Sequence, residues 1–570
     1  MKNQKYPTLT TPYIENMDKD TPWNEYPRPS MVRNSFLCLN GEWDFCVTKK
    51  DSLPIGFNEK ILVPFPPESH LSGLEREIPK GMMLHYRRKF TIPEGFNRGR
   101  IILHFGAVET ICTVIVNGEQ VCYHEGGYLP FSVDITDYLL AKENNLHIAV
   151  KDDLDLNYPY GKQTRKRGGM WYTPVSGIWQ TVWLESVPEK HIEGIKITPS
   201  MTSVNIKVLG GEDKKKITLE NGSVYEFSGD EITLSPEEIH LWTPDDPYLY
   251  NFTLECGEDE IKSYFALREI SIKNINGIAR LTLNGKPYLF NGLLDQGYYP
   301  DGIFLPATSE GYEKDILLAK SCGFNMLRKH IKVEPEIFYH LCDKLGMVVF
   351  QDMINNSSYS WLIDTALPTI GFKKIPIIFR HKSKKSRKIF IDTMKGIIDH
   401  LHFFPSVLYY TIFNEGWGQF SADKMYELAK SLDGTRIYDS TSGWFYRRKS
   451  DVDSRHVYFK PVKLERVTER PIIISEFGGY SHRVEGHLYG SAEYGYSSFE
   501  TREEYEASIH RLFGEEIKPL IKGGICGLVY TQISDVEDET NGLVTYDRRV
   551  LKLDADKTKA LMNELFEEIL

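Results

Sequence analysis

Two glutamates stand where apolar, strand-like segments of the chain stop. The first segment, residues 407–413, reads VLYYTIF and is followed by Asn414 and Glu415. The second, residues 471–475, reads PIIIS and is followed by Glu476, and glycines lie just beyond both glutamates. Runs this rich in β-branched and aromatic residues predict buried strands. If both strands belong to one parallel barrel, the two carboxylates open onto the face where such barrels carry their catalytic residues.

Two carboxylates facing one pocket are the fewest groups that can cleave a glycosidic bond with retention of the anomeric configuration. This mechanism requires the carboxyl groups to lie about 5–5.5 Å apart. One must stay protonated near neutral pH to donate to the departing oxygen, so its pKa must be raised, while the other must be ionised to attack the anomeric carbon. We assign Glu415 as acid/base and Glu476 as nucleophile. Asn414 is then expected to hydrogen-bond the sugar 2-hydroxyl. A single strand-end glutamate more often forms a salt bridge, but the repeated pattern favours function.

Other strand ends supply partners for these carboxylates. Arg328 and His330 finish an earlier strand, and a cation there would hold Glu476 ionised, although a structural ion pair within the barrel is an alternative for Arg328. Asp352 ends the next strand and is expected to orient that arginine. Tyr458 would donate its hydroxyl to the nucleophile, with packing inside the barrel as the alternative.

Further residues are candidates for contact with the sugar itself. Polar side chains that could bind hydroxyl groups follow the first and the eighth expected strands, and they are Asp295, Gln296, Gln532 and Asp535. A solvated turn is the alternative for the first two. Trp417 and Trp444 are candidate stacking platforms, because the C–H face of a pyranose packs well on an indole ring, although a tryptophan is often a core residue.

Residues 276–570 alternate strands with helices, which predicts a (β/α)8 TIM barrel. Its strands are expected at residues 288–294, 326–330, 348–352, 407–413, 436–440, 456–459, 472–475 and 527–533. Its helices are expected at residues 310–320, 335–345, 387–400, 421–432, 502–521 and 557–570. Residues 353–379, which contain Trp361, form an unusually long connection that we expect to cover the pocket.

The first half of the chain is rich in short strands separated by turn residues. Residues 1–190 predict a jelly-roll β-sandwich. Residues 191–275 have the length of one immunoglobulin-like sandwich without its cysteine pair, and we expect this domain to act as a spacer. The loop RKRGGMWY at residues 165–172 is either a surface loop or a segment that reaches a site elsewhere.

Composition excludes several classes of protein. The net charge of −11 argues against a nucleic acid or an anionic membrane as partner, and 41% hydrophobic residues support packed cores. The eight cysteines show neither a Cys-x-x-Cys pair nor zinc spacing, so we expect reduced thiols. No apolar run is long enough to span a membrane and no signal peptide is recognised, so we expect a cytoplasmic enzyme.

Six motifs and their order resemble glycoside hydrolase family 2, the family of β-galactosidases, β-glucuronidases and β-mannosidases. They are RNSFLCLNGEWDF at 33–45, WYTPVSGIWQTVW at 171–183, LWTPDDPYLY at 241–250, GFNMLRKH at 323–330, FNEG at 413–416 and SEFG at 475–478. The resemblance covers nearly the whole chain. It implies a retaining exo-β-glycosidase that acts on a carbohydrate through Glu415 and Glu476, and it is compatible with a homo-oligomer.

The chain departs from the family pattern at places that help to fix the sugar. Asp295 and Gln296 replace the usual histidine after the first strand, and RKHI at 328–331 stands where many members have Arg-x-Ser-His. The Asn-x-Lys pair of β-glucuronidases is not evident, since NGL occupies 541–543. We therefore expect a β-galactoside first, and a β-glucuronide, β-mannoside or arabinoside next.

Two other classes of function share these residues. A non-catalytic carbohydrate-binding protein would not need both carboxylates, whereas a transglycosylase would use every catalytic residue of a hydrolase. Some family members bind Mg²⁺ or Na⁺, but the sequence has no evident ligand cluster, and we expect no required cofactor.

Overall fold

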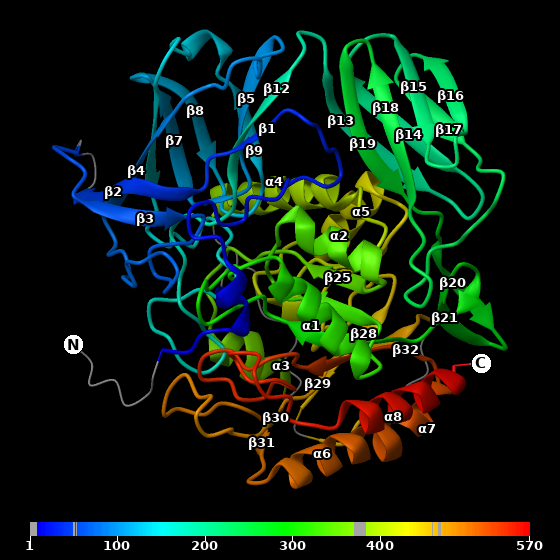
Figure 1. Cartoon of the computed structure of the whole chain (residues 1–570). Helices are drawn as coiled ribbons and strands as arrows, with labels where there is room; N and C mark the ends of the chain where they lie inside the picture. Colours follow the sequence, from blue (N-terminus) through cyan, green and yellow to red (C-terminus); the bar gives the residue numbers. More distant parts are fainter. Residues whose placement is uncertain are drawn as a thin grey trace.

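Two β-sandwiches and a parallel barrel follow one another along the chain. The computed structural model describes residues 8–49, 52, 54–369, 383–458, 460–464 and 469–569. The two sandwiches lie side by side at one side of the barrel, and the final helices of the chain lie at the opposite side (Figure 1). None of the helices in these ranges combines the length and the apolar character needed to cross a membrane.

The first sandwich is the predicted jelly roll, built from antiparallel strands whose apolar side chains share one core. One sheet has the order β1-β12-β5-β9, with strands Phe36–Cys38, Val182–Val187, Arg100–Phe105 and Phe131–Asp134. The other has the order β3-β2-β4-β10-β7-β8, with strands Glu59–Val63, Gly41–Lys49, Met82–Phe90, Asn144–Lys151, Ile111–Val116 and Glu119–Glu125. A short pair joins β6 (Val108–Glu109) to β11 (Gly177–Ile178). The Asn-Gly dipeptide at 117–118 forms the β7–β8 hairpin turn.

The second sandwich is the predicted immunoglobulin-like domain. Its sheets have the orders β13-β14-β17 and β16-β15-β18-β19. Their strands are Ile192–Pro199, Val204–Gly210 and Glu231–Leu234 in the first sheet, and Val224–Ser228, Lys214–Leu219, Tyr250–Cys256 and Asp259–Phe265 in the second. A three-stranded sheet of β20 (Ile270–Ile275), β21 (Ile278–Leu283) and β22 (Lys286–Pro287) then leads to the barrel. The exact domain boundaries at residues 190 and 275 stay predictions.

Eight parallel strands form the barrel. Seven of them lie close to their predicted places, whereas the sixth begins at residue 453, three residues before the predicted strand at 456–459. Their order is β27-β26-β25-β24-β23-β32-β29-β28, with pairing recorded between every neighbour in that order and none between β27 and β28 in the described chain. In chain order the strands are β23 (Phe290–Asp295), β24 (Met326–Lys329), β25 (Val348–Asp352), β26 (Val407–Thr411), β27 (Ile437–Asp439), β28 (Asp453–Val457), β29 (Ile472–Gly478) and β32 (Ile525–Thr531). Apolar side chains such as Phe350 and Tyr409, whose rings stack at 4.2 Å, fill the interior.

Helices cover the barrel as the sequence predicts, with one irregularity. They are α1 (Glu310–Ser321), α2 (Glu336–Leu345), α4 (Lys384–Leu401), α5 (Ala422–Leu432), α6 (Arg502–Arg511), α7 (Lys518–Ile521) and α8 (Ala555–Glu567). The predicted single helix at 502–521 is interrupted by a π-helical turn, η6 (Leu512–Ile517). Pro519 in α7 has no N–H to continue the regular ladder, which accounts for the change of helix type in this region.

The long connection after β25 lies partly at the mouth of the barrel. Its described part contains a π-helical turn, η3 (Trp361–Ala366), followed by α3 (Leu367–Thr369). Trp361 and Thr365 line the cavity that holds the two glutamates. The prediction that this segment covers the pocket is therefore confirmed for the part between residues 359 and 366, and residues 370–379 lie outside the described residues.

Candidate active site

Glu415 leaves the barrel wall in a tight turn directly after β26. The turn is a short 3-10 segment, η5 (Asn414–Gly416), in which Glu415 has a left-handed backbone with φ of 50°. Gly416 has φ of 63°, and a Cβ there would lie 2.5 Å from the ring of Phe445, so only glycine fits. The Glu415 amide donates to the Ser442 hydroxyl at 3.0 Å. The glycine that follows this glutamate in the sequence is thus a requirement of the turn.

Glu476 lies near the end of β29, where the pairing of the sheet is irregular. The register of β29 against β32 shifts between Ile474 and Phe477, which is the kind of bulge that re-aims a side chain beside an active site. Gly478 follows with φ of 80°, and a Cβ there would lie 2.3 Å from the ring of Tyr530. Both glycines of the sequence pattern therefore permit close packing behind the catalytic strand ends.

The carboxylate of Glu476 is buried among hydrogen-bond donors. Arg328 Nη1 donates to its Oε1 at 3.0 Å, and the Tyr458 hydroxyl donates to its Oε2 at 2.6 Å. Burial favours the neutral acid, but His456, Arg328 and His330, together with the Tyr458 hydrogen bond, outweigh burial and lower the pKa of Glu476 below that of an ordinary glutamate. An ionised carboxylate is the form that a nucleophile requires.

Arg328 ties the two strand ends together. Its guanidinium donates to Asp352 Oδ1 at 3.0 Å and to Asn414 Oδ1 at 2.8 Å, besides Glu476. Asp352 also accepts from His330 Nδ1 at 2.7 Å. Although burial opposes its ionisation, Arg328 and His330 lower the pKa of Asp352. The sequence-predicted set of Arg328, His330, Asp352, Asn414 and Tyr458 is thus brought together around Glu476.

His456 lies between the two glutamates and was not singled out from the sequence. Its Nδ1 is 3.0 Å from Glu415 Oε1 and 3.4 Å from Glu476 Oε2. One carboxylate oxygen of each glutamate and this nitrogen all lie within 4.8 Å of one another. A signal for it did exist, because residues two apart on a strand share a face, and His456 precedes Tyr458 by two.

A cavity of about 260 Å³ opens above these side chains. Predicted residues that line it are Gln296, His330, Asn414, Glu415, Trp444, Tyr458 and Glu476. Residues that the sequence did not suggest also line it, and they are Lys162, Met170, Leu294, Tyr359, Thr365, Ala366, Tyr494, Tyr496, Thr531 and Glu539. Gln296 Oε1 and Trp444 Nε1 are buried there without a protein partner among the described residues, which leaves both for a ligand.

Lys162 and Met170 reach this cavity from the jelly roll. Their loop is fastened to the barrel by the Tyr172 hydroxyl, which donates to Glu539 Oε2 at 2.7 Å, and by the Thr173 amide, which donates to Glu537 Oε1 at 2.8 Å. Of the two alternatives for the loop at 165–172, the structure therefore supports the segment that reaches a site elsewhere.

Four of the predicted sugar-contact residues do not line the cavity. Asp295 Oδ2 is bound to Lys329 Nζ at 2.6 Å, and Asp535 Oδ1 to Lys552 Nζ at 2.6 Å, because a buried carboxylate needs a cationic partner. Gln532 is buried and donates to Glu539 and Asn541. Trp417 is 3% exposed and donates to the Ser357 carbonyl. Their side chains are bonded to other groups of the protein instead.

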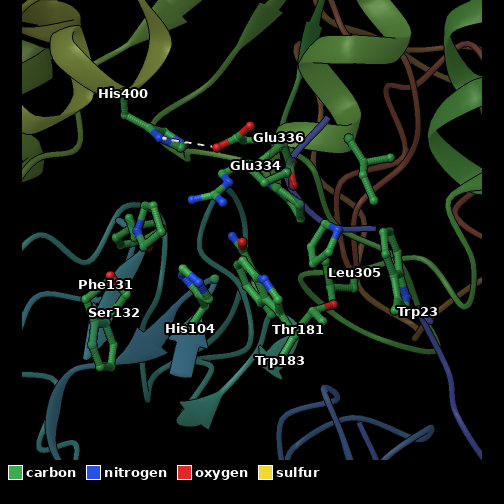
Figure 2. Close-up of a pocket in the computed structure, with 18 residues that line it drawn as sticks. Trp23, His104, Phe131, Ser132, Thr181, Trp183, Leu305, Glu334, Glu336 and His400 are labelled. Atoms are coloured by element: carbon green, nitrogen blue, oxygen red, sulfur yellow. Dashed lines mark ion pairs between the residues drawn. The ribbon is translucent and has the colours of Figure 1, made fainter. Parts of the chain in front are cut away.

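A second cavity, of about 170 Å³, lies between the jelly roll and the barrel and is lined by neither Glu415 nor Glu476 (Figure 2). His104 and Trp183, whose rings stack at 4.8 Å, form its jelly-roll side. Glu336 and His400, 3.9 Å apart, lie on its barrel side. The paired glutamates at the strand ends, Glu415 and Glu476, line the first cavity, so the chemistry is expected there.

Family models match most of the chain in the order of its domains. The model described as "Glycosyl hydrolases family 2, sugar binding domain" matches residues 63–188, "Glycosyl hydrolases family 2" matches residues 191–268, and "Glycosyl hydrolases family 2, TIM barrel domain" matches residues 274–509. The resemblance inferred from the six motifs is confirmed by these matches.

Individual relatives are distant. A β-galactosidase of Priestia megaterium is 24% identical over 474 residues, covering 76% of this chain and 43% of the relative, and the chain spans half or less of the length of the first curated relatives it matches. A β-D-glucuronidase structure of Dictyoglomus thermophilum has a TM-score of 0.75 at 18% identity, covering 94% of this chain and 98% of that one. A β-glucuronidase structure of an uncultured Clostridium species has a TM-score of 0.73 at 20% identity, covering 93% and 99%. The structural neighbours show the shared fold, and the three family models show that this chain belongs to glycoside hydrolase family 2.

Proposed function

We propose that this protein is a retaining exo-β-glycosidase that removes a terminal β-linked sugar through a covalent glycosyl-enzyme intermediate. The observation that carries the proposal is the spacing of the two carboxylates, whose nearest ligand oxygens lie within 4.8 Å. This spacing suits the separation of about 5–5.5 Å in retaining enzymes and is short of the roughly 6.5–9.5 Å that inverting enzymes need for a water molecule.

The different surroundings of the two glutamates support their assigned roles. Glu476 is held by a guanidinium and a phenol, and its lowered pKa favours attack on the anomeric carbon. Glu415 has a side chain 16% exposed at the cavity and is placed to donate a proton to the departing oxygen. In the second half of the reaction, Glu415 would accept a proton from the water that hydrolyses the ester.

Asn414 is proposed to bind the sugar 2-hydroxyl. Its Oδ1 accepts from Arg328 Nη2 at 2.8 Å and from the Ser442 hydroxyl at 2.9 Å, so its Nδ2 donor is the group left for the sugar. This hydrogen bond would strengthen as charge develops on the ring. The small volume of the cavity, about 260 Å³, with Trp444 among its lining residues, favours a terminal sugar unit over an internal one.

A β-galactoside is our first proposal for the substrate. Gln296 and Glu539 offer hydrogen-bonding groups suited to neutral hydroxyls, and relatives named β-galactosidase match the chain. One observation favours a β-glucuronide instead. Lys162 is a cation in the cavity, where it would pair with the carboxylate of a uronic acid, and structural neighbours named β-glucuronidase share the fold.

A panel of p-nitrophenyl glycosides tests the proposal directly. We expect cleavage of the β-galactoside, with β-glucuronide, β-mannoside and arabinoside as the comparison substrates. Glu415→Gln and Glu476→Gln should each lose most turnover, whereas Glu336→Gln, outside the catalytic cavity, serves as the matched carboxylate control. A folded protein that binds glycans but cleaves no glycoside would instead favour the carbohydrate-binding alternative. Product analysis with an added acceptor sugar separates hydrolysis from transglycosylation.

We propose that no metal ion is required. Ligand atoms of Glu415, His456 and Glu476 are close enough to hold an ion together, but an ion there would occupy both carboxylates that the sugar needs. In the mechanism proposed above, neither carboxylate binds a metal ion.

A further inference from the structure

His456 is buried and rigidly held between the two catalytic carboxylates. The residue is 4% exposed on β28, and its Nδ1 faces Glu415 Oε1 at 3.0 Å and Glu476 Oε2 at 3.4 Å. The backbone of Gly443 packs closely against the ring, since a Cβ on this glycine would lie only 2.9 Å from the imidazole. Trp444 packs against the ring edge-on, with the centroids 5.7 Å apart.

The chemistry of its neighbours fixes where the imidazole carries its proton. Both oxygens near Nδ1 belong to carboxyl groups that accept hydrogen bonds, so Nδ1 is the protonated nitrogen. Nε2 is buried and has no partner in the described parts of the chain. A single N–H donor therefore lies near two acceptors, hydrogen-bonded to Glu415 Oε1 and 3.4 Å from Glu476 Oε2.

The reaction moves one negative charge between these two acceptors. Before the first step, Glu476 is ionised and Glu415 is protonated. An oxygen of Glu476 then forms a bond to the anomeric carbon, the bond from that carbon to the aglycone oxygen breaks, and the Glu415 proton passes to the aglycone oxygen. Glu476 is now a neutral ester and Glu415 is ionised. Water reverses the exchange when it attacks the anomeric carbon, gives its proton to Glu415 and releases ionised Glu476.

Resting on the proposed function, we propose that His456 is a positioning residue whose Nδ1–H hydrogen-bonds Glu415 Oε1 and stabilises the ionised form of Glu415 in the intermediate. Because Nδ1 already reaches this oxygen, no rotation of the ring is needed. The hydrogen bond to Glu415 Oε1 also keeps the acidic proton of the free enzyme on Oε2, the oxygen left to face the aglycone.

The two carboxylates depend on His456 to different degrees. Glu476 also has Arg328 from β24 and the Tyr458 hydroxyl. For Glu415, His456 is the side chain recorded as hydrogen-bonding its carboxyl group within the described ranges. Further titratable groups that face this pair are His330, Tyr359, Tyr494, Tyr496 and Glu539. Loss of His456 should therefore harm mainly the state in which Glu415 is ionised.

Leaving-group dependence tests this expectation. The probes are the phenyl and the 2,4-dinitrophenyl glycoside of the sugar that the unaltered enzyme cleaves fastest. Phenol needs the Glu415 proton to depart, whereas dinitrophenolate does not. We expect His456→Leu to lower kcat/KM for the phenyl glycoside by about 10- to 100-fold, the loss of a hydrogen bond to a charged group. Cleavage of the dinitrophenyl glycoside should fall far less.

His456→Asn is the rescuing variant, because its amide N–H occupies about the place of Nδ1 and should restore the ratio of the two rates. His340→Leu, on α2 and away from the cavity, is the matched control, and thermal melting checks that each variant folds. Equal losses on both substrates, or no loss on the phenyl glycoside, would overturn the role of His456. No cleavage by the unaltered enzyme would instead refute the proposed function itself.

Discussion

Removing the Tyr458 hydroxyl should shift the pH dependence of the enzyme. This hydroxyl donates to Glu476 Oε2 at 2.6 Å and so stabilises the ionised nucleophile. In Tyr458→Phe the carboxylate keeps Arg328, at 3.0 Å from its other oxygen, but loses the phenol donor. The pKa of Glu476 should therefore rise toward that of an ordinary glutamate, and a larger share of the nucleophile should be protonated under acidic conditions.

The size of the shift follows from the type of hydrogen bond. A hydrogen bond to a charged group contributes about 1.5–3 kcal/mol, and about 1.4 kcal/mol corresponds to one pH unit. The acidic limb of kcat/KM should thus move upward by about one to two pH units.

The stability of the fold should depend on the ionisation of Glu476 in the same way. A lowered pKa in the folded state stabilises the fold above the unfolded pKa, and this stabilisation is lost as the pH falls through the folded pKa. Tyr458→Phe should reduce this pH-dependent stabilisation of the fold.

The assay is the pH profile of kcat/KM for an aryl glycoside with a good leaving group, for which proton donation by Glu415 matters least. Tyr530→Phe is the matched control, since this ring packs against Phe477 at a centroid distance of 5.8 Å and its hydroxyl is not hydrogen-bonded to Glu476. An acidic limb that stays in place in Tyr458→Phe, while activity falls at all pH values alike, would refute the claim that the phenol tunes the nucleophile.

Four further outcomes are expected. Glu415→Gln should slow a phenyl glycoside far more than a 2,4-dinitrophenyl glycoside, and equal slowing of the two would contradict the acid role. Asp535→Asn leaves the buried Lys552 unpaired and should destabilise the fold by about 3–5 kcal/mol with KM unchanged, as followed by denaturant unfolding and steady-state kinetics. Lys162→Met should reduce any glucuronidase activity about tenfold or more and leave galactosidase activity nearly intact, since only a uronic acid brings a carboxylate to this cation. Chelation with EDTA should leave turnover unchanged, and a loss restored by Mg²⁺ would refute metal-free catalysis.

The barrel and the catalytic pair could be predicted because their signals are local. Each barrel strand is a short apolar run bounded by turns or helices, and the strand ends of a parallel barrel open on one face whatever the loops do. Glu415 and Glu476 follow from that rule alone. Arg328, His330, Asp352 and Tyr458 also follow, since each ends a barrel strand or lies just beyond it.

The same rule failed where a polar residue at a strand end had a partner behind the barrel wall. Asp295 and Asp535 look like sugar ligands in the sequence, yet each is bound to a buried lysine at 2.6 Å. Lys329 lies next to Arg328 in β24, so alternate side chains of this strand point toward the cavity and away from it. Such pairing depends on contacts between distant segments, which no single stretch of sequence reveals.

The jelly-roll loop shows why the remaining residues of the site could not be predicted from the sequence. Lys162 is more than 250 positions from Glu415, and only the docking of its loop brings it to the cavity. The loop is held by acids of the barrel rim, whose Glu537 has a pKa raised to about 7 by burial even though it accepts hydrogen bonds from Thr173. A barrel without the jelly roll would keep Glu415 and Glu476 but would lose this cation, the Thr173 donor to Glu537 and the Tyr172 donor to Glu539. The two proposed catalytic glutamates thus come from the barrel alone, whereas we infer that the choice of sugar depends on the contact between the two domains.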